Sequence, residues 1–65
     1  MNHVSAVVDL EGEGRVTLEH DAKHVVVVFD TSEGLSCLRF DLSEARIVAN
    51  LLLQVAESLE REINR

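Results

Sequence analysis

The sequence predicts an α+β fold, an antiparallel meander of three to four strands with one long C-terminal helix packed on one face of the sheet. Three observations lead to this prediction. Four segments between residues 3 and 42 are rich in apolar and β-branched residues, and turns containing glycine or aspartate separate them. Residues 43–63 instead have helical periodicity, without glycine or proline. A sheet with one helix across it makes two layers around one core.

The predicted helix runs from Ser43 to Ile63 and consists mostly of good helix formers. Ser43 is the expected N-cap, because its hydroxyl can accept a hydrogen bond from an open amide of the first turn. Leu42 and Ile47 occupy the positions of a hydrophobic staple. Over its first three turns the helix is apolar on roughly 200° of its circumference, against about 100° for an ordinary surface helix. A single sheet cannot cover this arc, so we expect a further contact.

Residues 3–10 and 15–20 are predicted to form a first hairpin, because apolar residues alternate in both segments. We expect a three-residue loop at 12–14. This loop pairs Leu10 with Val16 and keeps the apolar sides of the two strands on one face, whereas a two-residue loop would mix the faces.

Residues 24–30 and 35–42 are predicted to form the second hairpin. The first of these segments is apolar on both faces, which is typical of a central strand covered on both sides. A three-residue loop at 32–34 pairs Val28 with Leu38. In this register the outer face of the sheet carries a second apolar group, namely Val7, Val25, Val27, Phe29, Leu35 and Cys37.

The 65 residues are expected to form a single domain, residues 1–65, which is short for a stable core of its own. Domains of this size usually add a disulfide, a metal or a partner subunit. The one cysteine excludes an internal disulfide, and no cysteine–histidine cluster resembles a zinc site, so oligomerisation remains. Without a signal segment or a run long enough to span a bilayer, we expect a cytoplasmic protein with no membrane contact.

The formal net charge of −6 comes from 12 acidic and 6 basic residues. Proteins that bind nucleic acids carry stripes of lysine and arginine, and the few basic residues of this chain are scattered. We therefore expect no nucleic-acid partner. The acidic residues concentrate in turns and near the helix ends, as solubility alone would place them.

His20 and His24 flank a turn that contains Asp21, so a hairpin could direct both imidazoles at one metal ion. Zinc sites need three or four ligands, and only the distant His3 or Asp9 could complete the set. We therefore interpret these residues as polar residues beside a turn and expect no metal site.

Cys37 alternates with apolar neighbours, which favours a packed thiol over a nucleophile. The glycines at 12 and 14 lack the spacing of a phosphate-binding loop and are not followed by a helix. No group of residues has the composition of a catalytic centre. The sequence leaves enzymatic activity open but favours a protein without it, and we expect no cofactor.

The run from Leu38 to Leu53 reads Leu-Arg-Phe-Asp-Leu-Ser-Glu-Ala-Arg-Ile-Val-Ala-Asn-Leu-Leu-Leu. It resembles a pattern in small uncharacterised actinobacterial and actinophage proteins, where a strand leads into Leu-Ser or Leu-Thr, then Glu-Ala-Arg, then a helix rich in alanine and leucine. This chain lacks the proline that those helices often carry after the cap. The resemblance implies a similar joint between strand and helix, and it implies no activity.

These observations favour a non-enzymatic, small acidic homo-oligomer, most simply a dimer, that acts through protein–protein interaction as an accessory, inhibitor or regulator of an unidentified protein partner. The alternative is a small-ligand or metal-binding module with a site between protomers. We expect the oligomer interface on the helix, where small residues let two helices approach closely. The expected interface consists of Ala45, Ala49, Leu51 and Leu53, and the alternative one, on the outer face of the sheet, consists of Val25, Val27, Phe29 and Cys37.

Overall fold

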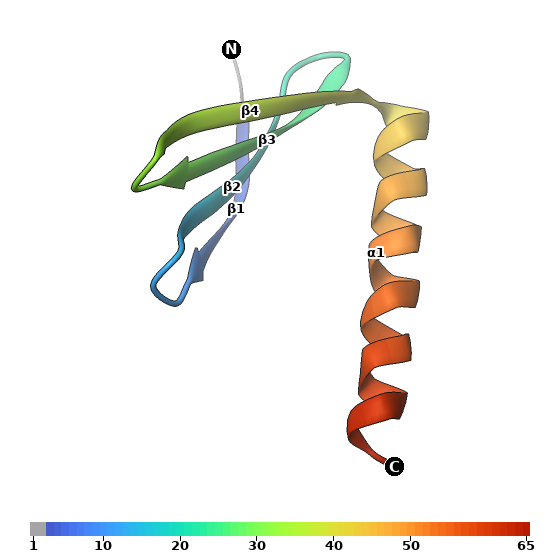
Figure 1. The fold of residues 1–65 in the computed structure, drawn as a ribbon. Helices are drawn as coiled ribbons and strands as arrows, with labels where there is room; N and C mark the ends of the chain where they lie inside the picture. Colours follow the sequence, from blue (N-terminus) through green and yellow to red (C-terminus); the bar gives the residue numbers. More distant parts are fainter. Residues whose placement is uncertain (1–2) are drawn as a thin grey trace.

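A computed structural model describes residues 3–65, apart from the side chain of Val4. Four strands precede one helix (Figure 1). The strands pair in sequence order, each antiparallel to the next. The predicted α+β class, with a meander and a long C-terminal helix, is confirmed. The elements are β1 (His3–Leu10), β2 (Gly14–His20), β3 (His24–Thr31), β4 (Gly34–Asp41) and α1 (Leu42–Ile63).

The loop between β1 and β2 has three residues, as predicted, but it lies one position earlier in the chain. Leu10 pairs with Gly14 and not with the predicted Val16. Glu13 N donates to Leu10 O over 3.0 Å, and Gly12 has a φ of 73°, as the third residue of a type II turn requires. Because the register moves by an even number of residues, the apolar sides of the two strands stay on one face.

The predicted register of the second hairpin is wrong by one residue. Leu38 pairs with Val27 and not with Val28. All five residues from Val25 to Phe29 are apolar, so the pattern of β3 alone could not distinguish the two registers.

The turn between β3 and β4 determines this register. Thr31 pairs with Gly34, and two residues lie between them. The hydroxyl of Thr31 accepts a hydrogen bond from Glu33 N over 3.3 Å and donates one to Gly34 O over 3.3 Å. A side-chain hydroxyl of this kind replaces a backbone group in closing a turn.

A slip of one residue moves every side chain of a strand to the other face. Val25, Val27 and Phe29, predicted on the outer face, therefore lie on the inner face, the side of the sheet that carries the helix. Cys37 lies opposite Val28 on the outer face. The predicted outer apolar group is thus divided equally between the two faces: Val25, Val27 and Phe29 are turned toward the helix, and Val7, Leu35 and Cys37 stay on the outer face.

The outer face of the sheet is mixed in polarity. One cross-strand row consists of Glu19, Val26 and Arg39. Two rows away on the same face, Arg15 Nε donates to Asp9 Oδ1 over 2.9 Å. Val26, at 2% exposure, is the only fully buried hydrophobic residue in the described part of the chain. The two side chains beside it in its row are long enough to cover it with their aliphatic stems.

The helix starts directly after the last residue of β4, so no loop separates strand from helix. Asp41 is the N-cap, and the predicted cap at Ser43 is wrong. Asp41 Oδ1 accepts from Glu44 N over 2.8 Å, and Glu44 Oε1 accepts from Asp41 N over 2.9 Å, which forms a capping box. The residue that ends the strand therefore also starts the helix, and this fixes the direction in which the helix leaves the sheet.

The helix extends past the sheet and lies against it only near its own N-terminal end (Figure 1). It contacts β3 and β4, and none of its residues is fully buried. The radius of gyration is 13.8 Å, with extents of 46 × 30 × 17 Å. A compact chain of this length would have a radius of gyration of about 11 Å. The single chain is therefore an open V of sheet and helix.

Alanine substitutions at two glycines test the turns. Gly14 and Gly34 have φ angles of 126° and 131°, a region that costs a residue with a side chain on the order of 1–2 kcal/mol. A Cβ at Gly14 would also collide with the carbonyl oxygen of Asp30, whereas a Cβ at Gly34 would meet open space. In urea denaturation at one protein concentration, Gly14→Ala should lower the free energy of unfolding more than Gly34→Ala. Equal losses would contradict the close approach of β2 to β3.

Candidate functional site

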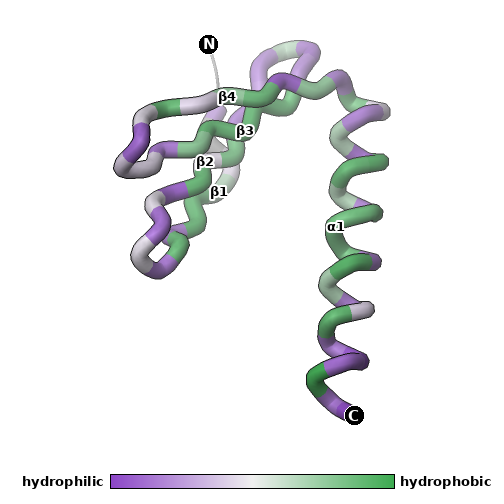
Figure 2. Tube along the Cα trace, viewed as in Figure 1, coloured by the Kyte–Doolittle hydropathy of each residue, from purple (hydrophilic) through white to green (hydrophobic). Residues whose placement is uncertain are grey.

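An apolar groove lies between α1 and the inner face of the sheet. It has two connected parts, of about 240 Å³ and 410 Å³, and only apolar side chains line them. Both parts share three residues of the sheet and two of the helix, namely Leu18, Val27, Phe40, Val48 and Leu52. Hydrophobic stretches run along the strands and the helix, and hydrophilic residues gather in the turns (Figure 2).

The two walls of the groove follow from two different periodicities. In the sheet, Leu18, Val27 and Leu38 form one cross-strand row, because every second residue of a strand points to the same face. In the helix, Val48 and Leu52 are four residues apart and lie on the same side. The joint at the end of β4 holds these walls facing each other without closing them (Figure 1).

The side chains of the groove and of the helix beyond it remain largely exposed. Leu38 is 51% exposed and Leu52 is 69% exposed. Farther along the helix, Val55, Leu59 and Ile63 are between 60% and 71% exposed. The total accessible surface is 5591 Å², whereas a compact monomer of this mass exposes about 4,100 Å².

The predicted helix interface does not form a single surface. Ala45 and Ala49 line the groove and face the sheet of their own chain, and Ala45 is the one partly buried residue of α1. Leu51 and Leu53 are two positions apart, which puts them about 200° apart around the helix axis. Whether these residues contact a second copy stays a prediction.

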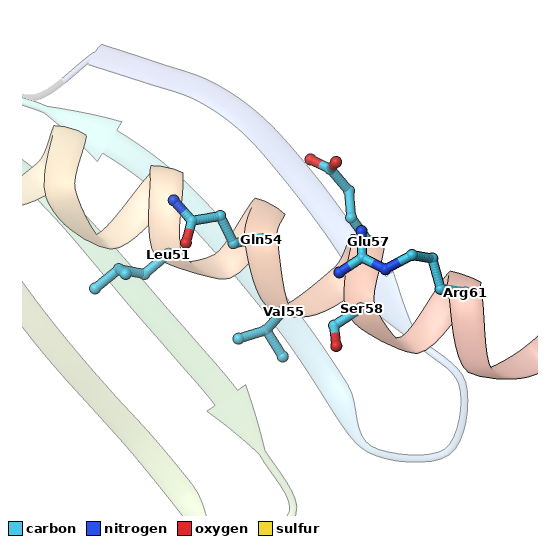
Figure 3. Close-up of a pocket in the computed structure, with 6 residues that line it drawn as sticks. All are labelled: Leu51, Gln54, Val55, Glu57, Ser58 and Arg61. Carbon is cyan, nitrogen blue, oxygen red and sulfur yellow. The ribbon is translucent and has the colours of Figure 1, made fainter.

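Leu51 borders a shallow hollow of about 370 Å³ on the flank of the helix. All of its lining residues come from α1, so no second element encloses it (Figure 3). A surface of this kind offers contact area and no enclosed site. The lining residues are Leu51, Gln54, Val55, Glu57, Ser58 and Arg61.

The alternative interface is also divided. Val25, Val27 and Phe29 line the groove. Cys37 is an exposed free thiol on the outer face, whereas the sequence pattern predicts a packed one. The groove was missed in the sequence because it depends on the register of β3 against β4. The surplus of apolar residues was the only signal that pointed to it.

The turn between β2 and β3 holds the predicted metal candidates around a hollow of about 300 Å³. Asp21 Oδ1 accepts hydrogen bonds from Lys23 N over 2.8 Å and from His24 N over 2.6 Å. These two hydrogen bonds hold the pKa of the Asp21 carboxyl below its usual range, because they stabilise the charged form, and the hydrogen bond from Lys23 N has the larger effect. His24 Nδ1 lies 3.5 Å from the same oxygen.

The imidazole of His20 is also engaged. Its Nδ1 lies 3.0 Å from the carbonyl oxygen of Asp21, and because a carbonyl only accepts, a hydrogen bond between them has Nδ1 as the donor. The ring of His20 stacks on that of His3, with centroids 5.1 Å apart. Within residues 3–65, no three cysteine, histidine, aspartate or glutamate side chains gather closely enough to hold a metal ion.

Within the same residues, no helix combines the length and the apolarity needed to cross a membrane. Comparison of the chain with protein-family models, curated proteins and solved structures finds no match. The resemblance of residues 38–53 to small actinobacterial and actinophage proteins stays a prediction.

The substitution Asp21→Asn tests the charged turn through its pH dependence. The pKa of Asp21 is lower in the folded chain than its unfolded value of about 3.9. The carboxylate therefore contributes stability that is present above the unfolded pKa and is lost as the pH falls through the folded pKa. The difference in free energy of unfolding between the native chain and Asp21→Asn should be largest near neutral pH and shrink in acid. A difference that stays constant with pH would refute this role.

Proposed function

We propose that this chain is a non-enzymatic, acidic homo-oligomer, most simply a two-fold dimer, that acts through protein–protein interaction as an accessory, inhibitor or regulator. The observation that carries the proposal is the accessible surface of 5591 Å². It exceeds that of a compact monomer of the same mass by about 1,500 Å². A standard interface covers about 800 Å² per partner, and obligate homodimers cover more. The surplus is therefore of the size that a permanent dimer buries.

The chemical character of the surplus accessible surface supports the same proposal. The groove is lined only by apolar side chains, and the exposed side of the helix continues it with leucine, valine and isoleucine. Ordering a residue costs about 1–2 kcal/mol of backbone entropy. With Val26 as the only fully buried hydrophobic residue among those described, one chain has little to offset this cost. A second copy would supply the missing half of the core.

The proposal includes a cytoplasmic location and a further protein partner. The exposed free thiol of Cys37 suits a reducing compartment. The net charge of −6 disfavours nucleic acid and suits a partner with a basic surface. The charged rows on the outer face of the sheet stay available to such a partner after the groove is covered.

A small-ligand or metal-binding module is the second candidate. The observation that favours it is the turn at Asp21, which brings two imidazoles beside one hollow. The groove itself is less suited to a small ligand, because binding sites for small molecules usually include a few polar groups that orient the ligand.

The first test of the proposal is the mass in solution. At micromolar concentration, light scattering after size-exclusion chromatography should give twice the chain mass of 7.2 kDa. The melting temperature should also rise with protein concentration, because association stabilises the folded chain by mass action. A stable mass near that of one chain would show that the proposal is wrong.

The second test separates the two candidates. Zinc at 100 times a dissociation constant would add about 2.7 kcal/mol to the stability of a protein that binds it only when folded. We expect no change in melting temperature when zinc is titrated into the native chain. A rise that His24→Ala abolishes would favour the metal-binding module instead.

A further inference from the structure

We infer that the open end of the groove receives the C-terminal half of α1 from a second copy. The exchange is reciprocal, so that two chains form a dimer about a two-fold axis in which each helix end packs on the sheet of the other chain. We call this arrangement the clasp. The inference rests on the dimer proposed above and identifies its interface. Val55, Leu59 and Ile63 of one copy would pack over β1 and β2 of the other, beside Val8 and Val16.

The inner face of the sheet has room for a second helix. Neighbouring strands lie about 4.8 Å apart and packed helices about 8–10 Å apart, so four strands can carry two helices side by side. The chain's own helix contacts only β3 and β4. Val8 and Val16 pair on the half of the inner face that this helix leaves uncovered, and both line the groove.

The C-terminal half of the helix has one apolar side that fits the groove. Val55 and Leu59 are four residues apart and Ile63 follows after four more, so the three side chains form a stripe along one side. Glu57 and Arg61 lie away from this stripe and can stay in solvent. Here the apolar arc is as narrow as that of an ordinary surface helix, which suits insertion into one groove.

The helix cannot fill the groove of its own chain. It starts without a loop after β4, and the capping box between Asp41 and Glu44 fixes its first turn. No glycine or proline inside α1 allows a kink that would turn its distal half back onto the sheet. The stripe and the uncovered strands therefore meet only between copies. Two grooves and two helix ends satisfy each other, and the assembly closes as a dimer.

A dimer joined only through its helices fits the structure less well. Ala45 and Ala49, the small residues that would let two helices approach closely, already face the sheet of their own chain. Such a contact would also leave Val8 and Val16 uncovered.

Disulfide trapping between two differently tagged chains tests the clasp. Both chains carry Cys37→Ser, which removes the native thiol. One chain then carries Leu59→Cys and the other carries Val16→Cys. We expect a disulfide that joins the two chains, seen as a mixed-tag species on a non-reducing gel. The matched control replaces Val16→Cys by Thr17→Cys, the next residue of β2, which points to the outer face and should give a several-fold lower yield.

Each outcome decides between the two proposals. A doubled mass together with the Leu59–Val16 cross-link supports the clasp. A doubled mass with no such cross-link, or with cross-linking only between two Leu53→Cys chains, overturns the clasp and leaves the proposed dimer standing. The mass of a single chain overturns both.

Charge variants give a second measurement that does not depend on thiol geometry. Leu59→Glu places a charge in the stripe and should raise the dimer dissociation constant by more than about tenfold. Gln54→Glu adds the same charge on the polar side of the helix and should leave the constant unchanged. Circular dichroism at high concentration shows whether each variant keeps its helix. Equal dissociation constants for the two folded variants would overturn the clasp.

Discussion

The direct junction between β4 and α1 determines how this protein can bury its apolar residues. Asp41 is the last residue of the strand and the N-cap of the helix, and Glu44 completes a capping box with it. A loop at this place would let the helix settle along the whole sheet. Without a loop, the helix leaves the sheet at a fixed angle, covers only part of the inner face and projects beyond it (Figure 1). The open groove is a consequence of this junction.

An open groove leaves a chain of this size with an incomplete core. The hydrophobic contacts that stabilise a small domain are split between an uncovered half of the sheet and a helix end that projects past it. In the dimer that we propose, folding and association would be coupled, because the folded monomer has few contacts to compensate the loss of chain entropy. The surplus surface and the acidic charge then have separate roles. In that dimer the apolar surface would complete the core, and the charged turns and outer rows would keep the assembly in solution.

The register of β3 against β4 brings Val25, Val27 and Phe29 to the side of the sheet that carries the helix. In the register expected from the sequence, Val25, Val27 and Phe29 formed a second apolar face, and the protein needed two different contacts. With Val27 opposite Leu38, these residues join the groove, and the outer face becomes a mixed surface that carries the ion pair between Arg15 and Asp9. In the dimer proposed above, one contact between copies would cover both this groove and the apolar stripe of the C-terminal half of the helix.

Alternation and helical periodicity predict a meander of three to four strands, the long helix and the excess of apolar residues, because these are local properties that each segment carries alone. Only the tertiary structure decided the register, the cap and the groove. Val25 to Phe29 are apolar on both faces, so the register depended on the hydroxyl of Thr31 closing the turn with Gly34. The position of the cap depended on where β4 ends. Asp41, which pairs with His24, is the last residue of the strand, and the helix begins at the next residue. The angle between helix and sheet depended on that junction, and the periodicity of the sequence does not predict this angle.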